Sequence, residues 1–150
     1  MTIRRLLLLG FSSALLAACG SSGKDPEDAV RAWVSEAESF AEDKDRRGLL
    51  SMISEDYADG RGNDHKRIGD MLRLYFMRAG KVAFLTSIDE IAVMDETAAM
   101  VNLTVGMAGT ETGALGINAD AYRFELELEH ADDEWMLIAA RWGTLGAEMR

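Results

Sequence analysis

The sequence predicts an α+β fold in which N-terminal helices pack on a curved antiparallel sheet of about four strands. Between residues 25 and 80, apolar side chains recur at spacings of three and four, the period of an amphipathic helix. Between residues 81 and 142 they alternate with polar side chains, the period of a strand with one buried face. Helices that precede strands without interleaving favour segregated layers.

The first predicted helix begins at a capping residue. Asp25 can accept hydrogen bonds from the free backbone N–H groups, and Pro26 suits the first helical position. Its apolar stripe consists of Val30, Trp33, Val34, Ala37 and Ala41. A shorter second helix is predicted over about residues 45–53, and the polar segment 54–62 is predicted to be a loop.

The third predicted helix has the clearest pattern. Asn63 or Asp64 is expected to cap its start, and Gly80 is expected to end it. Its apolar stripe consists of Ile68, Met71, Leu72, Tyr75, Phe76 and Ala79. We expect a sheet with one covered face to curl around this helix, because that arrangement buries every apolar stripe.

Alternation predicts four strands, over residues 81–94, 99–107, 122–128 and 135–142. The segments between them carry turn-forming residues: 95–96, the Gly-rich stretch 109–119, and 130–134. Residues 25–143 are therefore predicted to form one domain, and residues 144–150 a frayed C-terminal tail.

Residues 1–18 have the organisation of a secretory leader, with Arg4 and Arg5, a short apolar run and small residues before Cys19. The run is too short and too interrupted for a permanent membrane span. Leu16-Ala17-Ala18-Cys19 resembles the lipobox of bacterial lipoproteins. The resemblance implies cleavage before Cys19, acylation of its thiol, and anchoring of the mature chain in a membrane through the acyl chains.

Residues 19–24 are predicted to be a flexible tether, since Gly and Ser dominate them. Fully extended, the stretch from Cys19 to Asp25 reaches only about 20 Å, so the domain is expected close to the membrane. Gly20, rather than Asp, follows the cysteine. This resembles lipoproteins sorted to the outer membrane, and implies a periplasmic location there rather than at the inner membrane.

The net charge of −10 limits the classes of molecule that the protein can bind. Nucleic acid is excluded as a partner, because its binding needs a basic surface. The same balance disfavours docking of the domain on anionic lipid headgroups. The single cysteine, Cys19, excludes a disulfide within the chain, so the apolar core must stabilise the fold.

The order helix, helix, loop, helix and strand meander resembles the nuclear transport factor 2-like superfamily, which includes SnoaL-like proteins and ketosteroid isomerase. The resemblance rests on the segment 49–57, the amphipathic helix over 64–79 and the strands 122–128 and 135–142. It implies a cone whose open end can hold a small apolar ligand, and a homodimer formed through the sheet. The complete isomerase set of a base and an oxyanion-binding Tyr and Asp is not found here.

Three residues are weak catalytic candidates in such a cone: Asp56, Tyr57 and Tyr75. A carboxylate beside a phenol could transfer protons if burial tuned the pKa values toward neutrality. An isolated pair without a third group is weak evidence, and the favoured interpretation is that Tyr57 packs under the loop while Asp56 caps a turn.

Metal and cofactor sites are not predicted. Asp56, Asp59 and Asp64 suggest a calcium loop, but their spacing fails the alternate-residue pattern of such loops. His65 and His130 are expected at exposed positions, and with Cys19 acylated they cannot complete a zinc set.

Arg141 is a weak candidate for binding an anion. If its side chain points into the cone, it can hold an anionic group; if it points outward, we expect it to pair with an acidic ridge. That ridge consists of Glu125, Glu127 and Glu129, which share one face of a predicted strand. The ridge is interpreted as a solvated face. The alternatives are binding of a basic partner or of cations, and protection of the strand against pairing at its edge.

Three functions fit these observations. The first is a non-enzymatic lipoprotein that binds a small apolar ligand or a partner near the membrane. The second is a small SnoaL-like enzyme that acts on an apolar substrate in the cone. The third is an accessory of an assembly in the cell envelope. A structure can separate the first two, since an enzyme needs convergent polar groups in the cavity.

Overall fold

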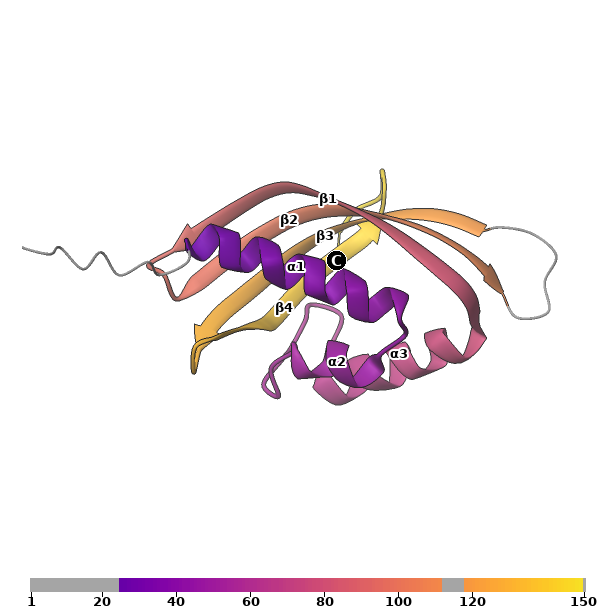
Figure 1. Cartoon of the computed structure of the whole chain (residues 1–150), viewed down its shortest axis with the longest axis horizontal. Coiled ribbons are helices and arrows are strands. Elements are labelled where there is room, and N and C mark those ends of the chain that lie inside the picture. Colours follow the sequence, from indigo (N-terminus) through magenta and orange to yellow (C-terminus); the bar gives the residue numbers. More distant parts are fainter. Residues whose placement is uncertain (1–24, 112–117, 150) are drawn as a thin grey trace, which may run out of the picture.

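The computed structural model describes residues 25–111 and 118–149, which form three helices on one side of a four-stranded antiparallel sheet (Figure 1). The predicted fold class is confirmed. The expected leader, the lipobox and the tether lie outside the described residues. None of the helices within those residues is long and apolar enough to cross a membrane.

Each helix begins at an aspartate whose side chain accepts hydrogen bonds from backbone N–H groups. Asp25 caps α1 (Pro26–Glu42), Asp45 caps α2 (Arg46–Ser51) and Asp64 caps α3 (His65–Arg78). The Asp64 bond, to Arg67 N, is 2.7 Å long. These caps satisfy amide groups that have no partner inside a helix, and so fix where each helix starts.

The sheet has the order β1-β2-β3-β4, so every strand neighbours the next along the chain. The strands are β1 (Ala79–Met94), β2 (Ala98–Glu111), β3 (Asn118–Ala131) and β4 (Glu134–Thr144). Two tight hairpin turns use pairs of residues with positive φ, Asp95 with Glu96 and Asp132 with Asp133. Two consecutive positive φ angles are typical of the hairpin turn that matches the twist of the strands.

Gly80 does not end α3, contrary to the sequence prediction. The helix stops at Arg78, and β1 begins at Ala79 without an intervening turn. The Ala79 N–H still bonds to Tyr75 O, but its backbone is extended, at φ −69° and ψ 130°. A left-handed glycine is therefore not needed, and Lys44 Nζ holds the junction by donating to Ala79 O at 2.7 Å.

The predicted loop over residues 109–119 is shorter at both ends than expected. Strand β2 runs through Glu111 and β3 begins at Asn118, with Gly109 paired to Asn118. Glycine weakens a strand but does not prevent one from forming. The hydrogen-bonded pairing of β2 with β3 therefore continues through Gly109. The rest of that loop lies outside the described residues.

The C-terminal tail is folded back rather than frayed. Thr144 still belongs to β4, Leu145 N donates to Ala121 O and Ala147 N to Thr144 O, each at 2.9 Å. Gly143 permits this return, because a Cβ there would lie 2.8 Å from Glu148 O. The tail could not approach the strand so closely beside a larger residue.

Three register shifts between neighbouring strands accompany the bending of the sheet. In β1 one lies between Ala79 and Val82 and another at Asp89, and in β4 the third lies at Ile138. A bulge bends its strand and increases the local twist. Figure 1 shows the resulting curvature, with α1 lying across the concave face.

The segment after α2 covers the outer edge of β4. Ser54 N donates to Leu137 O and Leu137 N donates to Met52 O, both at 2.9 Å, while Ala58 N reaches Ile138 O. These bonds satisfy backbone groups that an uncovered edge strand would leave open. They also anchor the loop that carries Asp56 and Tyr57.

The best-packed part of the core lies under the first half of α1. Val30, Val101 and Leu128 are fully buried there, with Ala99 and Trp135 around them. The remaining members of this core are Val34, Ile53, Tyr57, Leu103, Leu126 and Ala140. The end of the cone next to the C-terminal half of α1 and α3 is packed less tightly, and the candidate site lies there.

Candidate functional site

A cavity of about 520 Å³ lies between the concave face of the sheet, α3 and the second half of α1. The strands contribute Phe84, Thr86, Leu103, Val105, Met107, Tyr122, Phe124, Leu126, Leu137 and Trp142 to its wall. The helices and the residue pair after α2 contribute Trp33, Val34, Ala37, Glu38, Ala41, Leu49, Met52, Ile53, Ile68, Met71, Leu72, Tyr75 and Phe76.

The periodicities of the sequence account for this wall. Leu103, Val105 and Met107 alternate along β2 and face the helices, and the stripe predicted for α3 faces them from the other side. Met71 and Tyr75 belong to the wall and yet are each 41% exposed, so they lie at its rim. The cavity is therefore open beside α3.

Aromatic rings line much of the cavity. Along the sheet, the Tyr122 and Phe124 ring centroids are 6.4 Å apart, and the Phe124 and Trp142 rings are stacked at 6.5 Å with 22° between their planes. Across from them, Tyr75 and Phe76 lie 5.7 Å apart on α3. Such a surface favours a ligand that is itself aromatic or has a flat apolar body.

Few polar groups reach this wall. The polar side chains are Glu38, Thr86, Tyr75 and Tyr122. The Trp33 Nε1 atom is buried and has no hydrogen-bond partner within residues 25–111 and 118–149. A buried donor without a partner is uncommon, and this N–H is covered by protein atoms rather than open to the cavity.

Tyr75 is the one predicted candidate residue that the structure places in the cavity wall. Burial raises the pKa of its hydroxyl, with further contributions from Tyr122 and the Asp120 carboxylate. The hydroxyl therefore stays protonated at neutral pH and can donate a hydrogen bond to a ligand at the rim.

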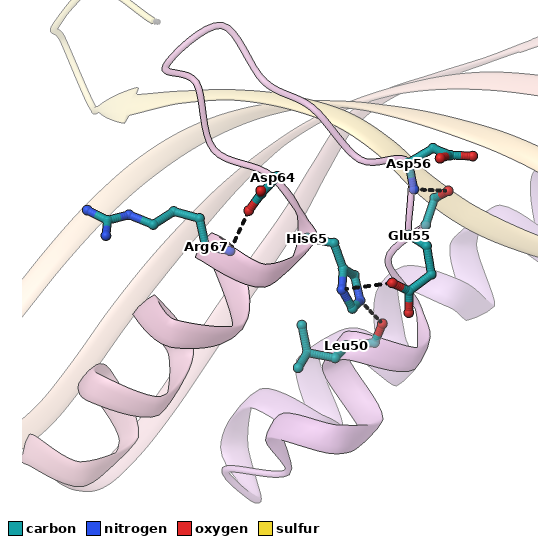
Figure 2. Close-up of polar contacts among 7 residues, drawn as sticks. Leu50, Glu55, Asp56, Asp64, His65 and Arg67 are labelled. Carbon is teal, nitrogen blue, oxygen red and sulfur yellow. Dashed lines mark hydrogen bonds and ion pairs between the residues drawn. The ribbon is translucent and has the colours of Figure 1, made fainter.

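Asp56 and Tyr57 do not line the cavity. Asp56 is exposed, and its backbone N–H donates to Ser54 Oγ at 3.2 Å (Figure 2). Tyr57 is only 3% exposed and packs under the loop in the core cluster. The hydrogen bonds between residues 52–58 and the edge of β4 hold both residues at that edge, outside the cavity wall. The structure therefore gives Tyr57 the packing role that the sequence favoured.

Asp59 organises this loop. Its carboxylate accepts hydrogen bonds from Arg61 N, Asn63 N, Asn63 Nδ2 and the Tyr57 hydroxyl, at 2.8–3.1 Å. Burial opposes its charge, but these hydrogen bonds dominate and lower the pKa of the Asp59 carboxyl. Of the acids suggested as a calcium loop, Asp59 and Asp64 have structural roles, with Asp64 engaged as the cap of α3, and the Asp56 side chain is exposed. No cluster of three metal-ligating side chains occurs in the part of the chain described.

His65 joins α3 to α2 rather than lying exposed as expected. Its Nε2 lies 3.3 Å from Leu50 O, and its Nδ1 lies 3.5 Å from Glu55 Oε2 (Figure 2). Nearby, the Leu50 side chain packs against Gly69, where a Cβ would come within 3.1 Å. These contacts fix the start of α3 against α2.

Arg141 points away from the cavity. Its guanidinium pairs with Glu125 on the outer face of the sheet, where the two residues are register partners in β4 and β3. The arrangement with the acidic ridge is therefore the one adopted, and Arg141 cannot serve an anion inside the cone. Glu125 is a member of that ridge, while Glu127 and Glu129 stay exposed beside it.

Comparison with solved structures shows which fold this is. A protein from Novosphingobium aromaticivorans, proposed to be a scytalone dehydratase, has a TM-score of 0.73 and 14% identity, over 83% of this chain and 85% of that one. A member of the nuclear transport factor 2-like family from Streptomyces avermitilis has a TM-score of 0.71 and 11% identity, over 81% and 97%. The chain has the nuclear transport factor 2-like fold.

A ketosteroid isomerase-like protein from Erwinia carotovora atroseptica shares the nuclear transport factor 2-like fold with this chain, with a TM-score of 0.70 and 11% identity over 83% and 100% of the two chains. At such identities the likeness shows the fold alone. Neither a protein-family model nor a curated protein matches the sequence. Function must therefore be argued from the cavity of this particular nuclear transport factor 2-like domain.

Two residues have features that the sequence did not indicate, one beside the cavity wall and one in it. Arg61, from the loop before α3, places its guanidinium 4.5 Å from the Trp142 ring centroid and donates to Trp142 O at 2.5 Å. Trp33 was assigned to the core stripe, and nothing in its spacing marks an unpartnered indole. A loop arginine that covers an aromatic ring on a distant strand leaves no local pattern in the sequence.

Proposed function

We propose that this protein is a lipid-anchored protein of the bacterial envelope that binds a small, largely apolar molecule in its cavity. The observation that carries the proposal is the wall itself. It encloses about 520 Å³ with apolar and aromatic side chains, a size typical of small-molecule sites. Protein interiors normally pack without voids, so side chains that leave a space of this size need a reason beyond folding.

The polar groups narrow the class of ligand. The hydroxyls of Tyr75, Tyr122 and Thr86 are donors, and the wall contains one carboxylate, Glu38. The best fit is a molecule with a flat apolar body and one acceptor group, such as a carbonyl or hydroxyl oxygen. Among the described residues no histidine and no second carboxylate line the cavity, which favours binding over acid–base catalysis.

Binding can be tested with the neutral apolar dye N-phenyl-1-naphthylamine. We use the mature chain from residue 19 with Cys19→Ser, so that neither the apolar leader nor an acyl chain contributes to the signal. Val105→Trp fills the cavity from β2 and should weaken dye binding at least about ten-fold, since it removes most of the apolar contact area. The matched control is Ala92→Trp, on the exposed outer face of β1. Equal dye binding by both variants would refute a ligand site in the cavity.

The anchor is supported by the lipobox resemblance at Cys19 and is tested separately. Cells that express the full chain are grown with a clickable palmitate analogue. The wild-type protein should carry the label and sediment with outer membranes, whereas Cys19→Ser should carry none. Unlabelled wild-type protein would remove the anchor from the proposal and leave the ligand site unaffected.

A further inference from the structure

The acidic net charge of the chain conceals a basic helix. Helix α3 carries Lys66, Arg67, Arg73 and Arg78 against a single acid, Asp70, in a chain of net charge −10. Lys66 and Asp70 neutralise each other through a 2.8 Å bond. Arg67, Arg73 and Arg78 belong to none of the ion pairs formed among the described residues. The helix therefore presents three arginines to solvent.

The same helix exposes apolar side chains on its outer side. Of the seven large apolar residues that are exposed in the described part of the chain, four lie on α3: Met71, Leu74, Tyr75 and Met77. Leu74 is 48% exposed and Met77 66% exposed. The sequence stripe explains Met71 and Tyr75, which form the cavity rim, but gives no partner for Leu74 and Met77.

Helical spacing places the two kinds of side chain together. Arg67, Leu74 and Arg78 are separated by seven and four residues, so they form one stripe. Lys66, Asp70, Arg73 and Met77 form the neighbouring stripe. Leu74 and Met77, three residues apart, thus lie at the centre of an outer face that arginines border on both sides. We call this face the α3 outer face.

We propose that the α3 outer face docks on an anionic lipid bilayer. An apolar centre bordered by arginines is the pattern of a helix that lies in the plane of a membrane interface. Leu74 and Met77 would enter the boundary between headgroups and acyl chains. The arginine side chains would extend to the phosphates, since their long apolar stems allow the charge to remain at the headgroups.

The acidic ridge on the sheet does not oppose this orientation. Glu125, Glu127 and Glu129 belong to the outer face of the sheet, whereas α3 lies on the helical side (Figure 1). A layer of helix alone is about 10 Å thick. Charges separated by more than about 8–10 Å at physiological ionic strength are largely screened. A bilayer that contacts the α3 outer face is therefore screened from the ridge, and the acidic residues that share the helical side with α3 are those of α1 and the loops, among them Glu27, Asp28 and Glu42.

Docking also brings the cavity to the lipid. Met71 at the rim is three residues from Leu74 and four from Arg67, so the opening adjoins the α3 outer face. A membrane-dissolved apolar molecule could then enter without crossing water. This inference goes beyond the ligand site and stands whether or not Cys19 is acylated, because it depends only on α3.

The test reports which face meets the membrane. In the mature chain, which begins at residue 19, with Cys19→Ser, Met77→Cys introduces the sole thiol, which is labelled with nitrobenzoxadiazole. Ser87→Cys, on the outer face of β1, is the matched control. With vesicles of phosphatidylcholine containing about one third phosphatidylglycerol, we expect a blue shift and a gain in emission at position 77 and neither at position 87. Pure phosphatidylcholine vesicles should give no shift.

Charge variants complete the experiment. Arg73→Gln should weaken vesicle binding, measured from the emission at position 77, by about five-fold, which corresponds to ~1 kcal/mol for one basic residue at an anionic surface. Arg123→Gln, an exposed arginine on the outer face of β3, should change it less than two-fold. The proposal is overturned by unchanged emission at position 77, by an equal shift at position 87, or by equal effects of the two charge variants. A shift without vesicles that grows with protein concentration would overturn it too, and would assign the face to a second copy.

Discussion

Tyr57 donates its hydroxyl hydrogen to Asp59 Oδ2 at 3.1 Å, under the loop that covers the edge of β4. The two residues support each other, since the phenol is buried and the carboxylate accepts three further hydrogen bonds within the loop. This places a Tyr–Asp pair in a structural position outside the cavity. Two predictions on stability and pH follow from its geometry.

Tyr57→Phe should lower the free energy of unfolding by about 1 kcal/mol at pH 7, because one hydrogen bond to a charged acceptor is lost. Burial, then the Asp59 charge and the bond to Asp59, raise the pKa of Tyr57 well above its usual value. The folded tyrosine therefore stays protonated at pH values where the unfolded one ionises. The wild-type protein should lose stability above about pH 10, and Tyr57→Phe should lose less.

Urea unfolding at pH 7 and at pH 10.5–11 measures this difference, with the remaining tyrosines common to both proteins. Parallel decline of the two proteins between these pH values would show that Tyr57 is not held in its protonated form by the fold.

Asp59→Asn should destabilise the fold by about 1–2 kcal/mol at neutral pH, because an amide replaces one acceptor oxygen by a donor. Hydrogen bonds lower the pKa of Asp59 in the folded state. A carboxyl whose folded pKa is depressed stabilises the protein above its unfolded pKa, and this contribution is lost as the pH falls through the folded value.

The stability gap between wild type and Asp59→Asn should therefore close below about pH 4, as acid titrations followed by circular dichroism can show. Asp56→Asn is the matched control, since its side chain is exposed, and it should change stability by less than about 0.5 kcal/mol at any pH. A gap that persists at pH 2 would mean that the Asp59 charge is not its source.

Gly143→Ala should release the C-terminal tail. The new Cβ would lie 2.8 Å from Glu148 O, a backbone atom that can move only with its segment. Hydrogen exchange of Leu145 and Ala147 amides should accelerate as their bonds to Ala121 and Thr144 weaken. Gly106→Ala is the control, because its Cβ would meet Leu85 O at 3.8 Å, an ordinary contact. Slow exchange of both amides in Gly143→Ala would contradict the packing of the tail.

The fold could be predicted because its signals are local. The aspartate caps, the stripe of α3 and the alternation of β2 each depend on neighbouring residues, and each recurs in the structure. The predicted end of α3 was wrong. Gly80 would end a helix only where the chain needs a left-handed turn, and here the chain passes directly from α3 into β1. The folded-back conformation of the C-terminal tail was not predicted. The tail packs against Gly143, and a single glycine gives no sequence pattern that would indicate this contact.

The candidate site was harder to predict, because a cavity is defined by what side chains fail to fill. The same stripe of Met71, Leu72 and Tyr75 would describe a tightly packed cone or an open one. Likewise, the family resemblance leads one to expect Asp56 and Tyr57 near the mouth of the cone. Only the three-dimensional bonds between residues 52–58 and β4 show that they lie elsewhere.

A final prediction separates packed core from cavity wall. Leu128 is 1% exposed among buried neighbours, so Leu128→Ala should lower the free energy of unfolding by about 2–5 kcal/mol. Leu72 faces the cavity and lacks contacts on that side, so Leu72→Ala should cost less, about 1–2 kcal/mol. Urea denaturation of both variants measures the difference. Equal losses would indicate that the wall is packed as tightly as the core, and would leave no room for a ligand.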